Sequence, residues 1–246
     1  MQQKAKTKNI SIVLYKPKHA GNIGSIARVA KNMGVGGIIV VGAKDFNQEE
    51  MMTRSTHLAA DYVDAINYYD DISEALASFT FIVGTTARLG KARGPFVSPR
   101  AAASQVAQLS PKNKIALLFG PEDKGLSNDE LRYCQAVVHI PTSREFTSLN
   151  LSHAVMILCY EIFTATLDSV AAPEFKRAHS AELEGMYRQI KELLAEIGFL
   201  NPENPDYWMT HLHRFLNRGG LLSREVKIIR GICRQLTWYA NRKKEG

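Results

Sequence analysis

The chain has 246 residues, which is enough for one large domain or for one domain with a substantial appendage. Hydrophobic residues make up 45% and charged residues 22%, a balance that is typical of a globular protein and excludes a fibrous or disordered chain. The net charge is +7, and the whole excess falls in residues 208–246. A localised basic segment favours a polyanionic partner, most commonly nucleic acid, although a solubilising tail is the simpler alternative.

Signals for export and for membrane insertion are missing from the sequence. No apolar run approaches the roughly 20 residues that a membrane-spanning helix needs, and the polar N-terminal residues lack the apolar core of a secretory signal. Cys134, Cys159 and Cys233 are odd in number and widely spaced, so they predict unpaired thiols, neither a disulfide framework nor a zinc site. We therefore expect a soluble, cytoplasmic protein that binds no membrane and no metal.

Residues 9–170 alternate short apolar runs with helical stretches. The apolar runs predict strands over Ile10–Leu14, Gly37–Val41, Phe81–Thr85, Ile115–Phe119 and Ala136–Ile140. Helices are predicted over Ile23–Met33, Ile72–Phe79, Pro99–Gln108 behind an N-capping Ser98, from Asn128 onward, and over Leu151–Leu167. Apolar runs without alternation are typical of strands that are covered on both faces. The pattern therefore predicts a doubly wound α/β domain with a mostly parallel sheet.

A break at Ser169–Pro173 separates this pattern from the basic end of the chain. We expect a linker over residues 169–180 and a small all-α extension over residues 181–246, with helices over Ser180–Ile197, Tyr207–Arg218 and Ser223–Asn241. In the last helix, a projection at 100° per residue predicts a face that packs on the preceding helices and carries Ile228, Ile229, Ile232, Leu236 and Tyr239. The opposite face is expected to bind RNA, by phosphate contact and base stacking, through Lys227, Arg230, Arg234 and Trp238. A merely solvated face is the alternative.

Three loops follow predicted strands, at the end of the sheet where open α/β folds bind ligands. They span Asn22–Arg28, Phe119–Leu126 and Ile140–Asn150. In the second loop, Gly120 allows a planar ligand to approach the backbone, and Glu122 could accept a hydrogen bond from a hydroxyl or amine. The third loop gathers Thr147, Ser148 and Asn150 at a helix N-terminus. Each loop alone is explained by helix capping, but all three at strand ends indicate one site.

In their order and separation the three loops resemble the SPOUT superfamily of RNA methyltransferases, within it the TrmH/TrmJ-like branch of ribose 2′-O-methyltransferases. The matching motifs are Asn22-Ile23-Gly24-Ser25-Ile26-Ala27-Arg28, Phe119-Gly120-Pro121-Glu122 with Gly125-Leu126, and Ile140-Pro141 with Ser148-Leu149-Asn150-Leu151. The resemblance covers about residues 8–168 and so assigns residues 1–168 to the methyltransferase domain. The tail from Ala181 looks like the C-terminal extension of the TrmJ-type enzymes.

The resemblance implies a fold, a cofactor and a substrate. The fold would contain a deep trefoil knot in the C-terminal part of the α/β domain, and the protein would be a homodimer with an active site shared across the interface. S-adenosyl-L-methionine would lie bent in the knot against Thr85, Thr86, Ala87, Gly120, Glu122, Ile140, Thr147, Ser148 and Leu149. The implied substrate is tRNA, methylated on the ribose of cytidine or uridine at position 32 of the anticodon loop.

The resemblance also implies which residues serve the reaction. Asn22 and Arg28 would face the RNA, and Ser148 and Asn150 would lie near the reacting centre. A guanidinium is a poor base because its pKa exceeds 12. We therefore expect Arg28 to bind phosphate and polarise the 2′-hydroxyl, whereas the role proposed within the family is that of a base.

Two positions depart from the commoner forms of the family and leave substrate choice open. Pro121 stands where relatives often carry a polar or basic residue, and His153 stands where a small residue is usual. Other functions also stay open: methylation of ribosomal RNA or of a base by the same fold, and RNA binding without catalysis. A nucleotide-dependent dehydrogenase would need the dinucleotide-binding glycine fingerprint, which the chain lacks.

Overall fold

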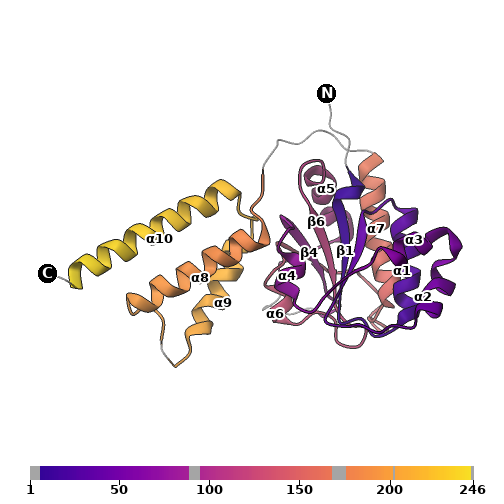
Figure 1. The fold of residues 1–246 in the computed structure, drawn as a ribbon, viewed down its shortest axis with the longest axis horizontal. Coiled ribbons are helices and arrows are strands. Elements are labelled where there is room, and N and C mark those ends of the chain that lie inside the picture. The colour runs from indigo at the N-terminus through magenta and orange to yellow at the C-terminus, as the bar shows by residue number, and fades with distance from the viewer. Residues whose placement is uncertain (1–5, 89–94, 168–175, 202, 245–246) are drawn as a thin grey trace.

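A parallel seven-stranded sheet forms the centre of the α/β part of the molecule (Figure 1). The computed structural model describes residues 6–88, 95–167, 176–201 and 203–244. The strands are β1 (Ile10–Tyr15), β2 (Gly37–Val41), β3 (Asn67–Tyr69), β4 (Phe81–Thr85), β5 (Phe96–Val97), β6 (Ile115–Phe119) and β7 (Ala136–Val138). They lie in the order β3-β2-β1-β6-β4-β7-β5, and every neighbouring pair is parallel. The predicted fold class is confirmed.

Helices cover both faces of this sheet (Figure 1). They are α1 (Ala20–Asn32), α2 (Gln48–Ser55), α3 (Ala60–Asp64), α4 (Ile72–Leu76), α5 (Pro99–Leu109), α6 (Asn128–Leu131) and α7 (Leu151–Leu167), with short 3-10 turns at Thr7–Asn9 and His57–Ala59. The start of α5 is set as predicted, because the Ser98 hydroxyl accepts a hydrogen bond from the Ala101 backbone N–H at 3.2 Å.

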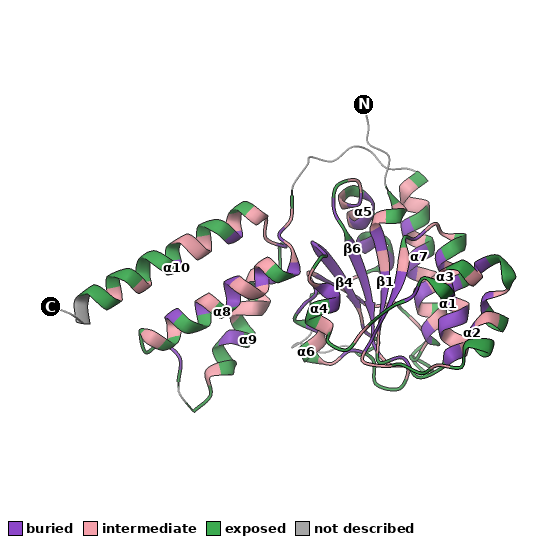
Figure 2. Cartoon of the chain, in the orientation of Figure 1, coloured by how far each residue is buried: buried purple, intermediate pink, exposed green. Residues whose placement is uncertain are grey.

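The two faces of the sheet carry separate hydrophobic cores, which explains the uninterrupted apolar runs. Along β1, Ile12 and Leu14 pack into the core beneath α1, α5 and α7, whereas Val13 packs into the core beneath α4 and α6. Successive side chains of a strand point to opposite faces, so a strand buried on both faces must be apolar at every position. In Figure 2 the central strands are accordingly coloured as buried.

Gly24 lets α1 lie directly against α2. A Cβ atom at this position would stand 2.2 Å from the Met51 carbonyl oxygen, a backbone atom that no side-chain adjustment can move. The glycine is buried, and both helices pack on the same core. The close approach therefore allows no side chain at this position of the first loop motif.

Four elements were missed from the sequence, all of them short or weakly amphipathic. The helices α2 and α3 bury few apolar side chains, so they show little hydrophobic periodicity. The strands β3 and β5 lie at the two edges of the sheet, and β5 has only two residues. The strand predicted to reach Ile140 ends at Val138. These elements are short or lie at the edges of the sheet, and the rest of the fold, more than their own sequence pattern, determines where they form.

The C-terminal helices α8 (Ser180–Glu196), α9 (Pro205–Asn217) and α10 (Ser223–Lys244) form a third hydrophobic core of their own. In Figure 1 they lie beside the sheet, on the side of α4 and α6. All three predicted helices are therefore present, with ends that differ from the prediction by at most three residues. Of the predicted linker, residues 169–175 lie outside the described residues.

The predicted packing face of α10 is mostly wrong, although Ile229 packs on the third core as predicted. Ile228, Ile232 and Leu236 are 61%, 54% and 47% exposed, whereas Val226 and Cys233 are buried against α8. Arg230, predicted on the open face, instead donates from Nε to the Gln189 side-chain oxygen at 3.2 Å. Arg230 can turn toward α8 because its guanidinium lies over Gly185, which has no side chain to displace it. On the α10 side the contact thus uses Val226, Ile229, Cys233 and one arginine.

Asn217 links the C-terminal helices to the sheet. Its amide nitrogen donates to the Arg132 carbonyl oxygen at 2.6 Å, and its amide oxygen accepts from the Tyr187 hydroxyl at 2.9 Å. The His213 ring stacks on Tyr187 with ring centroids 3.7 Å apart. A further contact is the hydrogen bond from the Ser180 N–H to the Phe79 carbonyl oxygen. The junction is therefore built from directed polar contacts.

Replacing Asn217 by alanine is expected to lower the free energy of unfolding by about 2 kcal/mol, because the buried Tyr187 hydroxyl and the part-buried Arg132 carbonyl group would lose their hydrogen bonds. Urea denaturation followed by tryptophan fluorescence measures the change, since Trp208 lies on α9 and Trp238 on α10. Asn241→Ala, at an exposed position of α10, is the matched control and should unfold like the wild type. Equal stability of the two variants would contradict the role given to Asn217.

Candidate active site at the carboxyl end of the sheet

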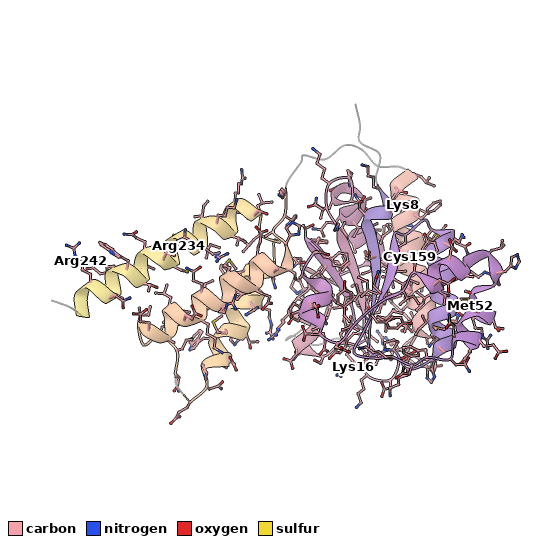
Figure 3. The ribbon with its side chains drawn as sticks, in the orientation of Figure 1. Lys8, Lys16, Met52, Cys159, Arg234 and Arg242 are labelled. Carbon is pink, nitrogen blue, oxygen red and sulfur yellow. The ribbon has the colours of Figure 1, made fainter. Side chains whose placement is uncertain are left out.

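A cavity of about 260 Å³ opens where β4 and β6 end. It is lined by residues 85–88, 119–125, 140, 147–149, 151 and 154. These segments come together because β6 pairs with β4, and β4 pairs with β7. All nine residues predicted to contact a cofactor line this one cavity: Thr85, Thr86, Ala87, Gly120, Glu122, Ile140, Thr147, Ser148 and Leu149. Figure 3 labels Lys16, which follows β1, at the same edge of the sheet.

The loop after β6 is folded tightly back on itself at Gly120. A Cβ atom here would stand 2.3 Å from both the Gly125 carbonyl carbon and the Leu126 nitrogen. Gly125 closes the turn with φ of +59° and donates its N–H to the Pro121 carbonyl oxygen at 2.7 Å. The positive φ favours glycine at this position. Both glycines are therefore needed for the backbone that forms one wall of the cavity.

Arg88 links the loop after β4 to the loop after β6 by hydrogen bonds. The sequence analysis did not predict a role for this residue. Its guanidinium donates to the carbonyl oxygens of Lys124 at 2.6 Å and Leu126 at 3.0 Å. Its backbone N–H donates to the Thr86 hydroxyl at 3.1 Å. The residue lies outside the three recognised motifs. Its one signal in the sequence is a cation placed three residues beyond a strand end.

Replacing Arg88 by alanine is expected to weaken cofactor binding about tenfold, since the loops after β4 and β6 would lose their two shared charge-assisted hydrogen bonds. Arg88→Lys should recover part of the affinity, because an ammonium can still reach one carbonyl oxygen. Isothermal titration calorimetry with S-adenosyl-L-methionine measures both variants. An unchanged dissociation constant for Arg88→Ala would show that the loops hold their positions without it.

Three predicted site residues from three different segments form one hydrogen-bonded chain. The segment Asn22–Arg28, predicted as a loop, instead lies within α1, so Asn22 is held by the first turn of that helix. The Asn22 amide nitrogen donates to one Glu122 carboxylate oxygen at 2.8 Å, and the Lys18 backbone N–H donates to the other at 2.9 Å. The Asn150 amide nitrogen donates to the Asn22 amide oxygen at 3.0 Å. Since both oxygens of Glu122 are engaged, this carboxylate positions the start of α1 and the segment before it beside the cavity.

Arg28 lies away from this chain of contacts. It is exposed on α1 and is not among the described residues that line the cavity. Six residues separate it from Asn22, which corresponds to a rotation of about 240° around the helix. Within one chain the structure therefore brings Asn22, Glu122, Ser148 and Asn150 to the cavity edge, but not Arg28.

The residues predicted to contact RNA through the C-terminal segment lie on α10, outside the cavity. Lys227 and Arg234 are exposed, and Trp238 is 53% exposed. The Arg242 guanidinium stands over the Trp238 ring, 5.4 Å from its centroid. Figure 3 shows Arg234 and Arg242 along this helix, well separated from the sheet. Of the four predicted residues, Arg230 is hydrogen-bonded to Gln189 of α8, and Trp238 contacts Arg242 on its own helix.

The cysteines offer no reactive group to the site. All three are free and buried, and burial raises the pKa of the Cys159 thiol to about 12 and also raises the pKa of Cys134. In the described part of the chain, no group of histidine, cysteine, aspartate and glutamate side chains is arranged to hold a metal ion. Within the same residues, no helix combines the length and the hydropathy that crossing a bilayer requires.

Two sequence families match the chain in succession. Residues 9–160 match the SpoU rRNA methylase family, and residues 181–245 match the family described as the C-terminal domain of the tRNA methyltransferase TrmJ. The first match includes all three sequence motifs and the cavity. The second includes helices α8 to α10.

Individual relatives agree with both matches. The tRNA (cytidine/uridine/adenosine-2′-O-)-methyltransferase TrmJ of Pseudomonas aeruginosa is 36% identical over 236 residues, which cover 91% of each chain. The crystal structure of TrmJ from Z. mobilis ZM4 superposes with a TM-score of 0.80 at 25% identity, covering 92% of this chain and 98% of that one. A solved structure that concerns the 2-OH methylation of C/U34 on tRNA superposes with a TM-score of 0.52 at 25% identity. The match covers 65% of this chain and 97% of that one. The chain therefore belongs to the SpoU rRNA methylase family and carries a C-terminal domain of the TrmJ type.

Proposed function

We propose that this protein is an S-adenosyl-L-methionine-dependent methyltransferase that modifies the ribose 2′-hydroxyl of a nucleotide in tRNA. The observation that carries the proposal is the convergence of all three motif segments on one cavity edge, through the contacts of Asn22, Glu122 and Asn150. The relative from Pseudomonas aeruginosa, which matches over nearly the whole chain, is named for this reaction.

The cavity residues fit the proposed cofactor. Gly120 contributes backbone to the cavity lining, and Ile140, Leu149 and Leu151 supply apolar surface beside which a flat ring system could lie. The hydroxyls of Thr147 and Ser148 stand on the same cavity wall and could hydrogen-bond a ribose or an amino-acid group. When bound, the cofactor supplies a methyl group on a positively charged sulfur, which is already a good electrophile.

The tasks left to the protein are alignment of the ribose and help with its proton. We assign alignment to Asn22, Asn150 and Ser148, since the two amides are held in a fixed chain from Glu122. Arg28 would bind the phosphate next to the reacting ribose and polarise the 2′-hydroxyl. An exposed guanidinium with no partner carboxylate among the described residues is suited to that contact.

A homodimer would complete this site, and two observations support it. Arg28 stands away from the cavity of its own chain, so a second copy would have to deliver it. The helix α7, which packs on α1 and α5 along one side, exposes Tyr160 at 52%, Phe163 at 36% and Leu167 at 67%. Apolar side chains of this size on one helix favour an interface. We further propose the trefoil knot for the segment that carries the cavity loops.

The remaining proposals concern domains and location. We propose a methyltransferase domain over residues 1–168, a linker over 169–180 and an RNA-binding domain over 181–246, in agreement with the two family matches. Lys227, Arg230, Arg234 and Trp238 are proposed to meet the RNA backbone and bases. A cytoplasmic location suits a tRNA-modifying enzyme, and the three free cysteines support a reducing compartment.

Incubation of the purified protein with tritiated S-adenosyl-L-methionine and either total tRNA or ribosomal RNA tests the function. Label should enter tRNA and survive in a 2′-O-methylated cytidine or uridine, which mass-spectrometric mapping should place at position 32. Label at position 34 would move the site within the anticodon loop, and label in ribosomal RNA or in a base would replace the proposal. A protein that binds no cofactor in calorimetry would instead be a non-catalytic RNA-binding relative.

A further inference from the structure

A second cavity, of about 100 Å³, lies at the junction of the sheet with the C-terminal helices. One wall is formed by α6 and the start of β7, and the other by α9. We name it the junction cavity and define it by Arg132, Gln135, Thr210, His213, Arg214 and Arg218. Its volume equals that of about three liquid waters, which suits a phosphate group rather than a whole nucleoside.

The wall formed by α9 is one face of that helix. Thr210, Arg214 and Arg218 follow one another at intervals of four residues, so their side chains lie in a row. Asn217 lies on the same side and fixes its direction, because its amide nitrogen donates to the Arg132 carbonyl oxygen across the junction. Arg214 of α9 and Arg218, the residue that follows the helix, therefore face the α/β part of the molecule, which contributes Arg132.

The junction cavity is positively charged. Three arginines line it, and no carboxylate does among the described residues. Arg132 interacts electrostatically with Glu184, Asp129 and Asp206, all of which stand outside the lining. Arg214 and Arg218 have no acidic partner in the described part of the chain. Burial, together with the charge of Arg132, lowers the pKa of His213 to about 4. The ring is thus neutral at pH 7, and the guanidinium groups alone supply the charge.

We propose that the junction cavity binds a phosphodiester group of the RNA substrate through Arg132, Arg214 and Arg218. Guanidinium groups match the phosphate oxygens in geometry as well as in charge. The proposal rests on the proposed tRNA substrate and adds a second contact point to it. Gln135 lines the junction cavity and Ile140 lines the first cavity. Five residues of extended chain span about 17 Å, so an RNA strand a few nucleotides long reaches from one to the other.

The test compares Arg214→Gln and Arg218→Gln in the full-length protein with Arg224→Gln, which removes one exposed charge of α10 outside the cavity. Filter binding of labelled total tRNA at several salt concentrations gives the dissociation constants. Each cavity variant is expected to bind tRNA about tenfold more weakly at low salt and to reduce the slope of log K against log salt by about 0.7 to 0.9. The affinity for S-adenosyl-L-methionine and the melting temperature should stay at wild-type values.

Two outcomes would overturn the proposal. One is tRNA binding by both cavity variants that equals that of Arg224→Gln. In the other, inorganic phosphate stabilises the wild type but not the two cavity variants, and the variants keep wild-type affinity for tRNA. This result would assign the cavity to a small phosphorylated ligand. If the wild-type protein methylates tRNA, either of these outcomes contradicts only the role of the junction cavity and not the proposed function. Wild-type protein that binds the cofactor but methylates no tRNA would instead contradict the proposed function.

Discussion

Gly120→Ala is expected to abolish measurable binding of S-adenosyl-L-methionine. The added Cβ would lie 2.3 Å from the backbone of Gly125 and of Leu126, so the loop after β6 could accept it only by opening. A displacement of this loop removes one whole wall of the cavity and breaks the contacts of Arg88 with Lys124 and Leu126. Calorimetry should show an affinity at least about a hundredfold lower, since overpacking of about 3 kcal/mol corresponds to that factor.

Gly37→Ala provides the matched control for this substitution. The same methyl group at Gly37 of β2 would have no atom within 4 Å, and cofactor affinity should stay at the wild-type value. Circular dichroism during heating separates a local opening of the loop from a loss of the fold. Cofactor binding by folded Gly120→Ala at wild-type affinity would refute the assignment of this cavity.

Arg28→Ala is expected to abolish methyl transfer while cofactor affinity stays within about twofold of the wild-type value. The guanidinium does not line the cavity of its own chain, so its removal leaves the cofactor contacts intact. Loss of a positioning contact and of a polarising charge at the 2′-hydroxyl should lower kcat by about a hundredfold or more. Single-turnover transfer of tritium to tRNA measures the rate, and calorimetry measures the affinity. A large loss of cofactor affinity would refute this role.

Lys31→Ala, which removes a cation from the same helix, is the control for charge and should methylate tRNA at nearly the wild-type rate. Mixed dimers sharpen the test. Chains that carry Arg28→Ala still have an intact cavity, and chains that carry Gly120→Ala still have Arg28. Co-refolding the two inactive variants should therefore restore activity if a second copy delivers Arg28. Mixtures that stay inactive, although the two chains associate, would contradict a shared site.

Much of the fold could be predicted because the central strands are buried on both faces. The apolar runs at Gly37–Val41, Phe81–Thr85 and Ile115–Phe119 coincide with β2, β4 and β6. The site was predicted less directly, because each loop taken alone looks like a helix cap. Only the pairing of β4 with β6 and β7 brings residues 85–87, 120 and 140 to one cavity, and sequence patterns do not encode that pairing.

The errors concern surfaces that tertiary contacts decide. Projection of α10 placed the larger apolar side chains toward the preceding helices, yet Ile228 and Ile232 are exposed and Cys233 is buried. Helix periodicity identifies an apolar face but does not say which face a neighbour can approach most closely. Arg88 was missed for a similar reason. Its hydrogen-bond acceptors are backbone carbonyl groups more than thirty residues away, which no pattern of residue types reveals.

Gly24 shows that a sequence motif can preserve a distance as well as a chemical group. It stands between Asn22 and Arg28 in the first loop motif, but it touches α2, where a Cβ would meet the Met51 carbonyl oxygen at 2.2 Å. Any side chain there would push α1 away from α2 and carry the Asn22 amide with it. The alignment of Asn22 with Glu122 thus depends on the spacing of two helices, and a substitution at Gly24 would imitate the loss of a site residue.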